Sequence, residues 1–183
     1  MLRLVLLVSV CLAACTSAPD REDPPAPPRS DASLGLDAEG LRVVSGGATR
    51  LVAFGTSERL TLRAVGPLAG GVAERSENAE CGAGPVQFAR TRGGLQLAFQ
   101  DGLFAGWWLD TPAGGDAPTL STLDGLGIGT ARTGFDALGM AVTVEETSLG
   151  TEFAAGEVYG LLSGPGPEAR VTDLWAGVSC TFR

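Results

Sequence analysis

The sequence contains no histidine and no lysine, and these two absences exclude several catalytic chemistries. Without histidine, no Ser-His or Cys-His pair can activate a nucleophile, and no imidazole can bind zinc. Without lysine, there is no amine for a Schiff base and no ammonium group for a nucleotide phosphate loop. We therefore expect no catalytic residue, no cofactor and no metal ion, and we interpret the protein as a non-enzyme.

Positive charge is scarce as well. All 13 basic residues are arginines, and 21 acidic residues bring the formal net charge to −8. Proteins that bind nucleic acid present a basic face to the phosphates, so we do not expect a nucleic-acid partner. The abundant carboxylates leave one catalytic alternative open, a hydrolase that uses two acidic groups as glycosidases do. Its candidates near predicted strand ends are Glu145, Glu146, Glu152 and Glu157, which also fit a solvated acidic rim.

The only long apolar run stands at the start of the chain. Residues 1–14 comprise a short basic start that ends at Arg3, an apolar stretch over 4–12, and two small residues. This is the pattern of a secretory signal peptide. A helix needs about 20 apolar residues to span a bilayer, and the apolar stretch is shorter than that. We predict that residues 1–14 are removed.

The segment Leu12-Ala13-Ala14-Cys15 that closes this stretch resembles the lipobox of bacterial lipoproteins. In that family the signal peptide is cut before the cysteine, whose thiol receives a diacylglycerol and whose new amino terminus receives a further acyl chain. The resemblance implies that Cys15 carries a lipid anchor with palmitate-like chains, which holds the protein on a membrane. Thr16 stands where an aspartate would retain such a lipoprotein in the inner membrane. The resemblance thus implies an outer-membrane lipoprotein facing the periplasm in a Gram-negative host, and otherwise one on the outer face of the cell membrane.

Residues 15–39 follow as a predicted tether. They hold five of the eleven prolines, few apolar residues and charges of both signs. Chains of this composition stay extended and solvated, so we expect a spacer between the anchor and a single domain over residues 40–183.

The four cysteines are accounted for by this processing. Cys11 is lost with the signal peptide and Cys15 is acylated, which leaves Cys81 and Cys180 in an oxidising compartment. We predict a disulfide bond between them. A reactive free thiol is the alternative, but no lysine or histidine exists to lower its pKa.

Strand patterns dominate the domain. Between residues 85 and 109, Leu95, Leu97 and Phe99 alternate with more polar residues, and Gly93-Gly94 and Asp101-Gly102 flank them as hairpin turns, which predicts three antiparallel strands. A second block over 140–182 contains five strand-like segments, with the sequences MAVTV, TEF, VYGLL, RVTDLW and VSCTF.

Each block follows a short segment with a helical pattern. Gly55-Thr56 precedes SERLTLRAV, and Gly129-Thr130 precedes ARTGFDAL, 74 residues later. In the second segment Ala131, Phe135 and Leu138 share one helix face, and Thr130 is placed to cap it. The first segment fits a strand as well as a helix, and we choose helix. The predicted fold class is α+β, a mainly antiparallel sheet with two short helices in two tandem halves, about 40–112 and 119–183.

This tandem layout, with a Gly-Thr pair opening each helix, resembles the β-lactamase-inhibitor-protein-like fold and the related small outer-membrane assembly lipoproteins. Members of that group bind proteins through a concave sheet and carry out no catalysis. The resemblance implies an envelope protein as partner.

Aromatic residues are the candidates for such an interface. Trp107 and Trp108 are consecutive in a predicted strand and therefore point to opposite faces. Together with Trp175 and Tyr159 they form the candidate interface, with burial in the core as the alternative. The predicted function is a lipid-anchored protein-binding or envelope-assembly module; the alternatives are a small-molecule or glycan-binding module and the carboxylate-based hydrolase.

Overall fold

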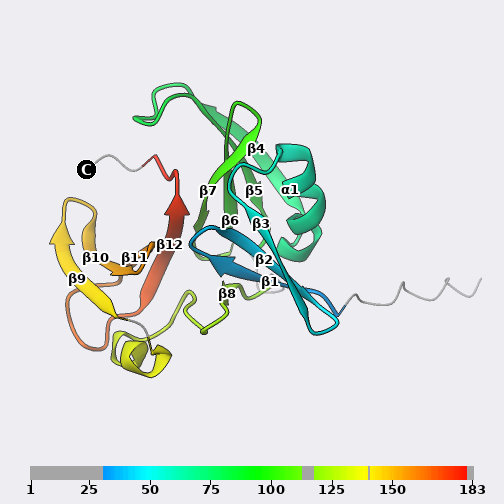
Figure 1. Ribbon diagram of the computed structural model, residues 1–183. Helices are drawn as coiled ribbons and strands as arrows, with labels where there is room; N and C mark the ends of the chain where they lie inside the picture. The colour runs from blue at the N-terminus through cyan, green and yellow to red at the C-terminus, as the bar shows by residue number, and fades with distance from the viewer. Residues whose placement is uncertain (1–30, 113–117, 140, 181–183) are drawn as a thin grey trace, which may run out of the picture.

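The computed structural model describes residues 31–112, 118–139 and 141–180 (Figure 1). The predicted signal peptide, the predicted acylation site Cys15 and the predicted tether up to residue 30 lie outside the described residues. In the described part the protein is mostly antiparallel β-sheet with two short helices, as the predicted α+β class requires. The strands form one sheet of eight and one of four.

The large sheet consists of two four-stranded meanders joined edge to edge. Its strand order is β4-β5-β6-β7-β12-β11-β10-β9. The two meanders meet where β7 pairs with β12, and Trp108 lies directly opposite Trp175 at this junction. The bounds of the strands are Val72–Asn78 (β4), Val86–Thr91 (β5), Leu95–Gln100 (β6), Leu103–Leu109 (β7), Val142–Thr147 (β9), Gly150–Ala155 (β10), Val158–Leu162 (β11) and Val171–Gly177 (β12).

The three strands predicted over residues 85–109 are confirmed as β5, β6 and β7. Four of the five strands expected over residues 140–182 form as well, but the prediction for VSCTF is wrong in its described part, 178–180. At Gly177 the backbone takes a φ of +70°, a left-handed conformation that glycine adopts readily, and this bends the chain off the sheet. The bend leads the chain toward Cys81.

The helix expected in the first half forms as α1, Glu58–Val65. Its counterpart is a 3-10 helix, η2, Arg132–Leu138, and the predicted cap at Thr130 is wrong. The N-cap residue is Ala131, and the Thr130 hydroxyl instead accepts a hydrogen bond from the Gly127 N–H at 3.1 Å. That bond holds the loop before the helix, so the hydroxyl does not serve the free N–H groups of the first turn.

A small sheet of order β3-β2-β1-β8 packs against the large sheet. We did not predict it, and the predicted tether boundary at residue 39 is wrong because β1 begins at Ser33. Leu34 and Leu36 on β1 are both buried, and β1 pairs with a distant segment as well as with its neighbour. The strands are Ser33–Asp37 (β1), Gly40–Ser45 (β2), Ala48–Ala53 (β3) and Ser121–Thr122 (β8); a 3-10 turn, η1, covers Pro67–Ala69.

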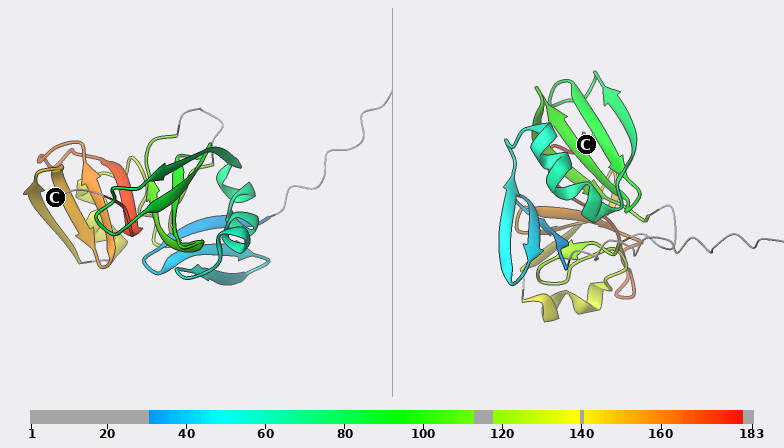
Figure 2. Two further views of the ribbon diagram at one scale, coloured as in Figure 1. Left: turned by 90° about the horizontal axis from the view of Figure 1, so that it is seen from above. Right: turned by 90° about the vertical axis from the view of Figure 1, so that its right-hand side faces the viewer.

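The helices and the small sheet cover one face of the large sheet, which we call the covered face (Figure 2). Trp107 points to this face, is 0% exposed and donates its indole N–H to the carbonyl oxygen of Asp37 on β1 at 2.9 Å. On the second meander, Phe135 of η2 packs on Phe153 of β10 with ring centroids 5.0 Å apart. The core therefore lies between the large sheet and the layer formed by α1, η2 and the small sheet.

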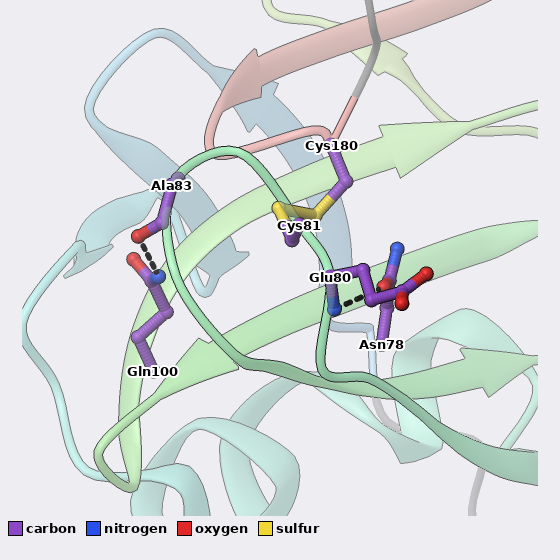
Figure 3. The surroundings of a disulfide bond; sticks show 6 residues. All are labelled: Asn78, Glu80, Cys81, Ala83, Gln100 and Cys180. Atoms are coloured by element: carbon purple, nitrogen blue, oxygen red, sulfur yellow. Dashed lines mark hydrogen bonds between the residues drawn. A yellow bond between two sulfur atoms is a disulfide. The ribbon is translucent and has the colours of Figure 1, made fainter.

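The predicted disulfide between Cys81 and Cys180 is present, with the two Cα atoms 5.3 Å apart (Figure 3). It joins the loop after β4 to the segment after β12, which are separated by 99 residues. Around it lies a second, smaller hydrophobic cluster that includes Val86 and Ala98. Ala98 shares its sheet face with Gln96 and Trp108, so the disulfide cluster occupies the face opposite the helices.

A candidate protein-binding surface on the large sheet

Three aromatic side chains form a row across the middle of the large sheet, on the face opposite α1. Trp108 on β7, Trp175 on β12 and Tyr159 on β11 are direct cross-strand neighbours. The Trp108 and Trp175 rings are stacked, with centroids 4.5 Å apart and planes 4° from parallel. The Tyr159 ring follows at 6.2 Å and 21°. We call this side of the sheet the aromatic face.

The row is packed most tightly at its centre. Trp175, between the other two rings, is 2% exposed, whereas Trp108 and Tyr159 are half-buried. Aromatic pairs at these separations stabilise a sheet beyond the area they bury, so the row contributes to holding β7, β12 and β11 together. Of the four residues in the predicted interface, the structure brings these three together.

Trp107 does not belong to this surface. The pleat sends consecutive residues of a strand to opposite faces, and Trp107 is the one that points into the core. We therefore remove Trp107 from the candidate interface and assign it to the packing between the two sheets.

Hydrogen bonds to carboxylates orient the two outer rings. The indole N–H of Trp108 donates to Oδ1 of Asp173 at 3.1 Å. The hydroxyl of Tyr159 donates to Oε2 of Glu157 at 3.3 Å. We did not single out Asp173 from the sequence, although its spacing of two from Trp175 places both on one face of β12.

Acidic residues continue along the aromatic face. The strand register sets Asp173 opposite Leu161, Leu161 opposite Glu152, and Glu152 opposite Glu145, so all four share one face. Glu152 is buried, at 2% exposed, and Glu145 is exposed. The five strands from β7 to β9 in the sheet order contain four acidic residues and no basic one. Three of these four acidic residues, Glu145, Glu152 and Asp173, lie on the aromatic face.

In the part of the chain that the structure describes, an arginine shares the aromatic face farther along the sheet, on β5. Arg90 shares a sheet face with Gln96 and hence with Trp108. Its guanidinium donates to Oδ1 of Asp110 at 2.5 Å, and both side chains are about one-third exposed, at 33% and 30%. This ion pair lies on the first meander. The strands of the second meander contain acidic residues and no arginine.

The glutamates considered for a hydrolase are divided between the two faces. Glu145 and Glu152 are cross-strand partners on the aromatic face, and Glu157 contacts Tyr159. Glu146 points to the covered face, where its carboxylate accepts a hydrogen bond from the Thr151 hydroxyl at 2.7 Å. The structure therefore brings three of the four to the aromatic face.

Two further properties concern only the described residues. Within them, no group of three or more His, Cys, Asp or Glu side chains is arranged to hold a metal ion. In the same ranges no helix has the length and apolar character needed to cross a bilayer.

Comparison of the chain with protein-family models, with curated protein sequences and with solved structures returned no significant match.

Proposed function

We propose that the protein is a lipid-anchored, non-catalytic binding module of the cell envelope, and that its aromatic face binds a protein partner. The anchor rests on the segment Leu12-Ala13-Ala14-Cys15, which stands between an apolar stretch and a proline-rich one. The disulfide between Cys81 and Cys180 agrees with a compartment outside the cytoplasm.

The observation that carries the binding role is the combination of a stacked aromatic row with strands that contain acidic residues and no basic one. Tryptophan and tyrosine are the residues most often found at the energetic centre of protein interfaces. Arginine and lysine side chains pair with carboxylates and pack on aromatic rings, so such a surface complements a basic one. We infer that the partner presents arginine or lysine residues to Trp108, Glu145 and Glu157.

We also propose that the domain consists of two tandem halves, each a short helix followed by a four-stranded meander. The Gly55 N–H donates to Phe104 O at 2.7 Å, and the Phe104 N–H donates to Thr56 O at 2.8 Å. The Gly129 N–H donates to Val171 O at 2.8 Å, and the Val171 N–H donates to Thr130 O at 2.9 Å. Both glycines have a left-handed backbone, with φ of +88° and +86°.

These matching bonds support a duplication in which each Gly-Thr pair holds the first residues of the last strand of its own half. Counting from those bonds, Trp108 and Trp175 occupy equivalent positions, four residues after Phe104 and Val171. The stacked tryptophans then stand at the junction of the two halves. The same layout supports the resemblance to the β-lactamase-inhibitor-protein-like fold, whose members use such a sheet for binding.

The test is recovery of a partner from intact envelopes by chemical cross-linking, with two charge-matched variants. Glu145→Gln/Glu157→Gln removes two exposed carboxylates from the aromatic face. Asp136→Asn/Glu168→Gln removes two exposed carboxylates elsewhere. We expect the first pair to lose the partner and the second to retain it, and we expect high salt to weaken the complex.

A result in which both variants, and also Trp108→Ala, retain the same partner would exclude the aromatic face as the binding surface. A partner without a basic surface would contradict the charge argument.

A further inference from the structure

One stretch of this acidic chain carries a net positive charge. Between residues 40 and 71 the sequence has four arginines, at 42, 50, 59 and 63, and one acidic residue, Glu58, which gives a net charge of +3. The whole chain has a net charge of −8, so the remaining residues sum to −11. This stretch builds β2, β3 and α1.

Two of these arginines line one groove, and a third is exposed next to it on α1. The groove runs between β3 and α1 and has a volume of about 370 Å³; Arg50 and Arg63 line it together with Leu60 and the buried Val52. Arg59 is exposed one helical turn before Arg63. Leu60, between them in the sequence, is 47% exposed, one of few large apolar side chains left to solvent in the described part.

The positive charge of this surface is not neutralised locally. Glu58, the acidic residue of α1, pairs with Arg75 on β4. Arg42 pairs with Asp37 at the other end of the small sheet. Among the described residues, Arg50, Arg59 and Arg63 take part in no ion pair.

The groove lies close to the point where the chain enters the fold. In the register of the small sheet, Leu34 near the start of β1 is opposite Val43, and Val43 is opposite Arg50. Neighbouring strands are about 4.8 Å apart, so Arg50 lies about 10 Å from the entry. In Figure 1 the chain enters the folded region on the side that carries α1. Only 17 residues, 16–32, lie between Cys15 and Ser33.

We propose that this surface, formed by Arg50, Arg59, Arg63 and Leu60, binds the anionic phospholipid headgroups of a membrane. Each arginine near an anionic bilayer strengthens binding about fivefold, and the aliphatic side chain adds burial at the headgroup boundary. The surface lies on the α1 side of the large sheet, so it directs the aromatic face away from the membrane, toward a partner. The orientation of the aromatic face away from the membrane rests on the proposed lipid anchor. The affinity of the arginine surface for anionic lipid does not depend on that anchor.

The experiment is vesicle sedimentation of the chain without its predicted signal peptide, residues 15–183, carrying Cys15→Ala, which removes the site of lipid attachment. The vesicles are phosphatidylcholine alone or equal parts of phosphatidylcholine and phosphatidylglycerol, at low ionic strength. We expect preferential binding to the anionic vesicles. Arg50→Gln/Arg63→Gln should reduce that binding about twenty-five-fold, because each arginine contributes about fivefold.

The matched control is Arg132→Gln/Arg170→Gln, which removes the same charge from the second half of the chain, where both side chains bond backbone carbonyls. We expect this control to bind anionic vesicles nearly as the parent does, with thermal unfolding used to verify that both variants are folded. Equal losses in the two variants would mean that only net charge matters and would overturn the proposal. Equal binding to the two kinds of vesicle would also overturn it. Neither outcome bears on the partner proposal, which is tested on the other face.

Discussion

Removal of the disulfide bond should lower the stability of the protein by several kcal/mol. The bond closes a loop of 99 residues, and the chain-entropy model gives about 4.7 kcal/mol for a loop of about 100 residues. The bond also holds the segment after β12 over Val86 and Ala98, which would become accessible to water. We expect the double variant Cys81→Ala/Cys180→Ala to lose between about 3 and 5 kcal/mol of unfolding free energy.

The assay is equilibrium unfolding in urea, monitored by tryptophan fluorescence. With a urea dependence of about 2 kcal/mol per molar, the midpoint should fall by about 2 M. Reducing agent should shift the parent protein toward the midpoint of the double variant and leave the variant unchanged. A double variant as stable as the oxidised parent would refute the reasoning, because the cross-link would then constrain nothing in the unfolded chain.

The remaining predictions concern single side chains of the large sheet. Gly160→Ala should destabilise the protein by about 1 to 3 kcal/mol, because the added Cβ would lie 2.5 Å from ring atoms of Phe153; Gly164→Ala, with open space around its Cβ, should be neutral in the same thermal scan. Trp107→Ala should cost about 3 to 5 kcal/mol as a core truncation, measured by urea unfolding. Trp108→Ala should cost less stability but abolish partner binding, and the opposite ranking of the two tryptophans in unfolding would contradict the assignment of faces.

Local patterns predicted the elements whose partners are close in sequence. The alternation of Leu95, Leu97 and Phe99, with glycine-containing turns on both sides, was enough to predict β6 and its two neighbours. The spacing in residues 57–65 fitted a strand as well as a helix, and the helix that we chose forms as α1. In these cases the side chains that decide the structure lie within one hairpin or one helical turn.

Elements that depend on distant partners were not predictable in this way. Leu34 and Leu36 are only two apolar residues beside a proline-rich stretch, and β1 is completed by a parallel pairing of Gly35 with Ser121. The cap expected from Thr130 failed because the preceding loop uses its hydroxyl. Hydrogen bonds of this kind follow from the path of the loop, which the sequence pattern does not specify.

The candidate site was predictable in its residues but not in its arrangement. The alternation of a strand shows that Trp107 and Trp108 point to opposite faces, but only the packing of β1 shows which of them is buried. The pairing of β7 with β12 joins the two meanders, and this contact brings Trp108 onto Trp175. Stacking between the two meanders could not be inferred from either meander alone.

The central claim, that the aromatic face binds a basic protein partner in the envelope, is tested most directly by site-specific photo-cross-linking in intact cells. A photo-reactive residue is placed at Glu145 on the aromatic face or, as the control, at the exposed Glu168. We predict one cross-linked partner from position 145, absent from position 168 and lost when Trp108→Ala is added. Adducts that are equal at the two positions, or unaffected by Trp108→Ala, would contradict the account.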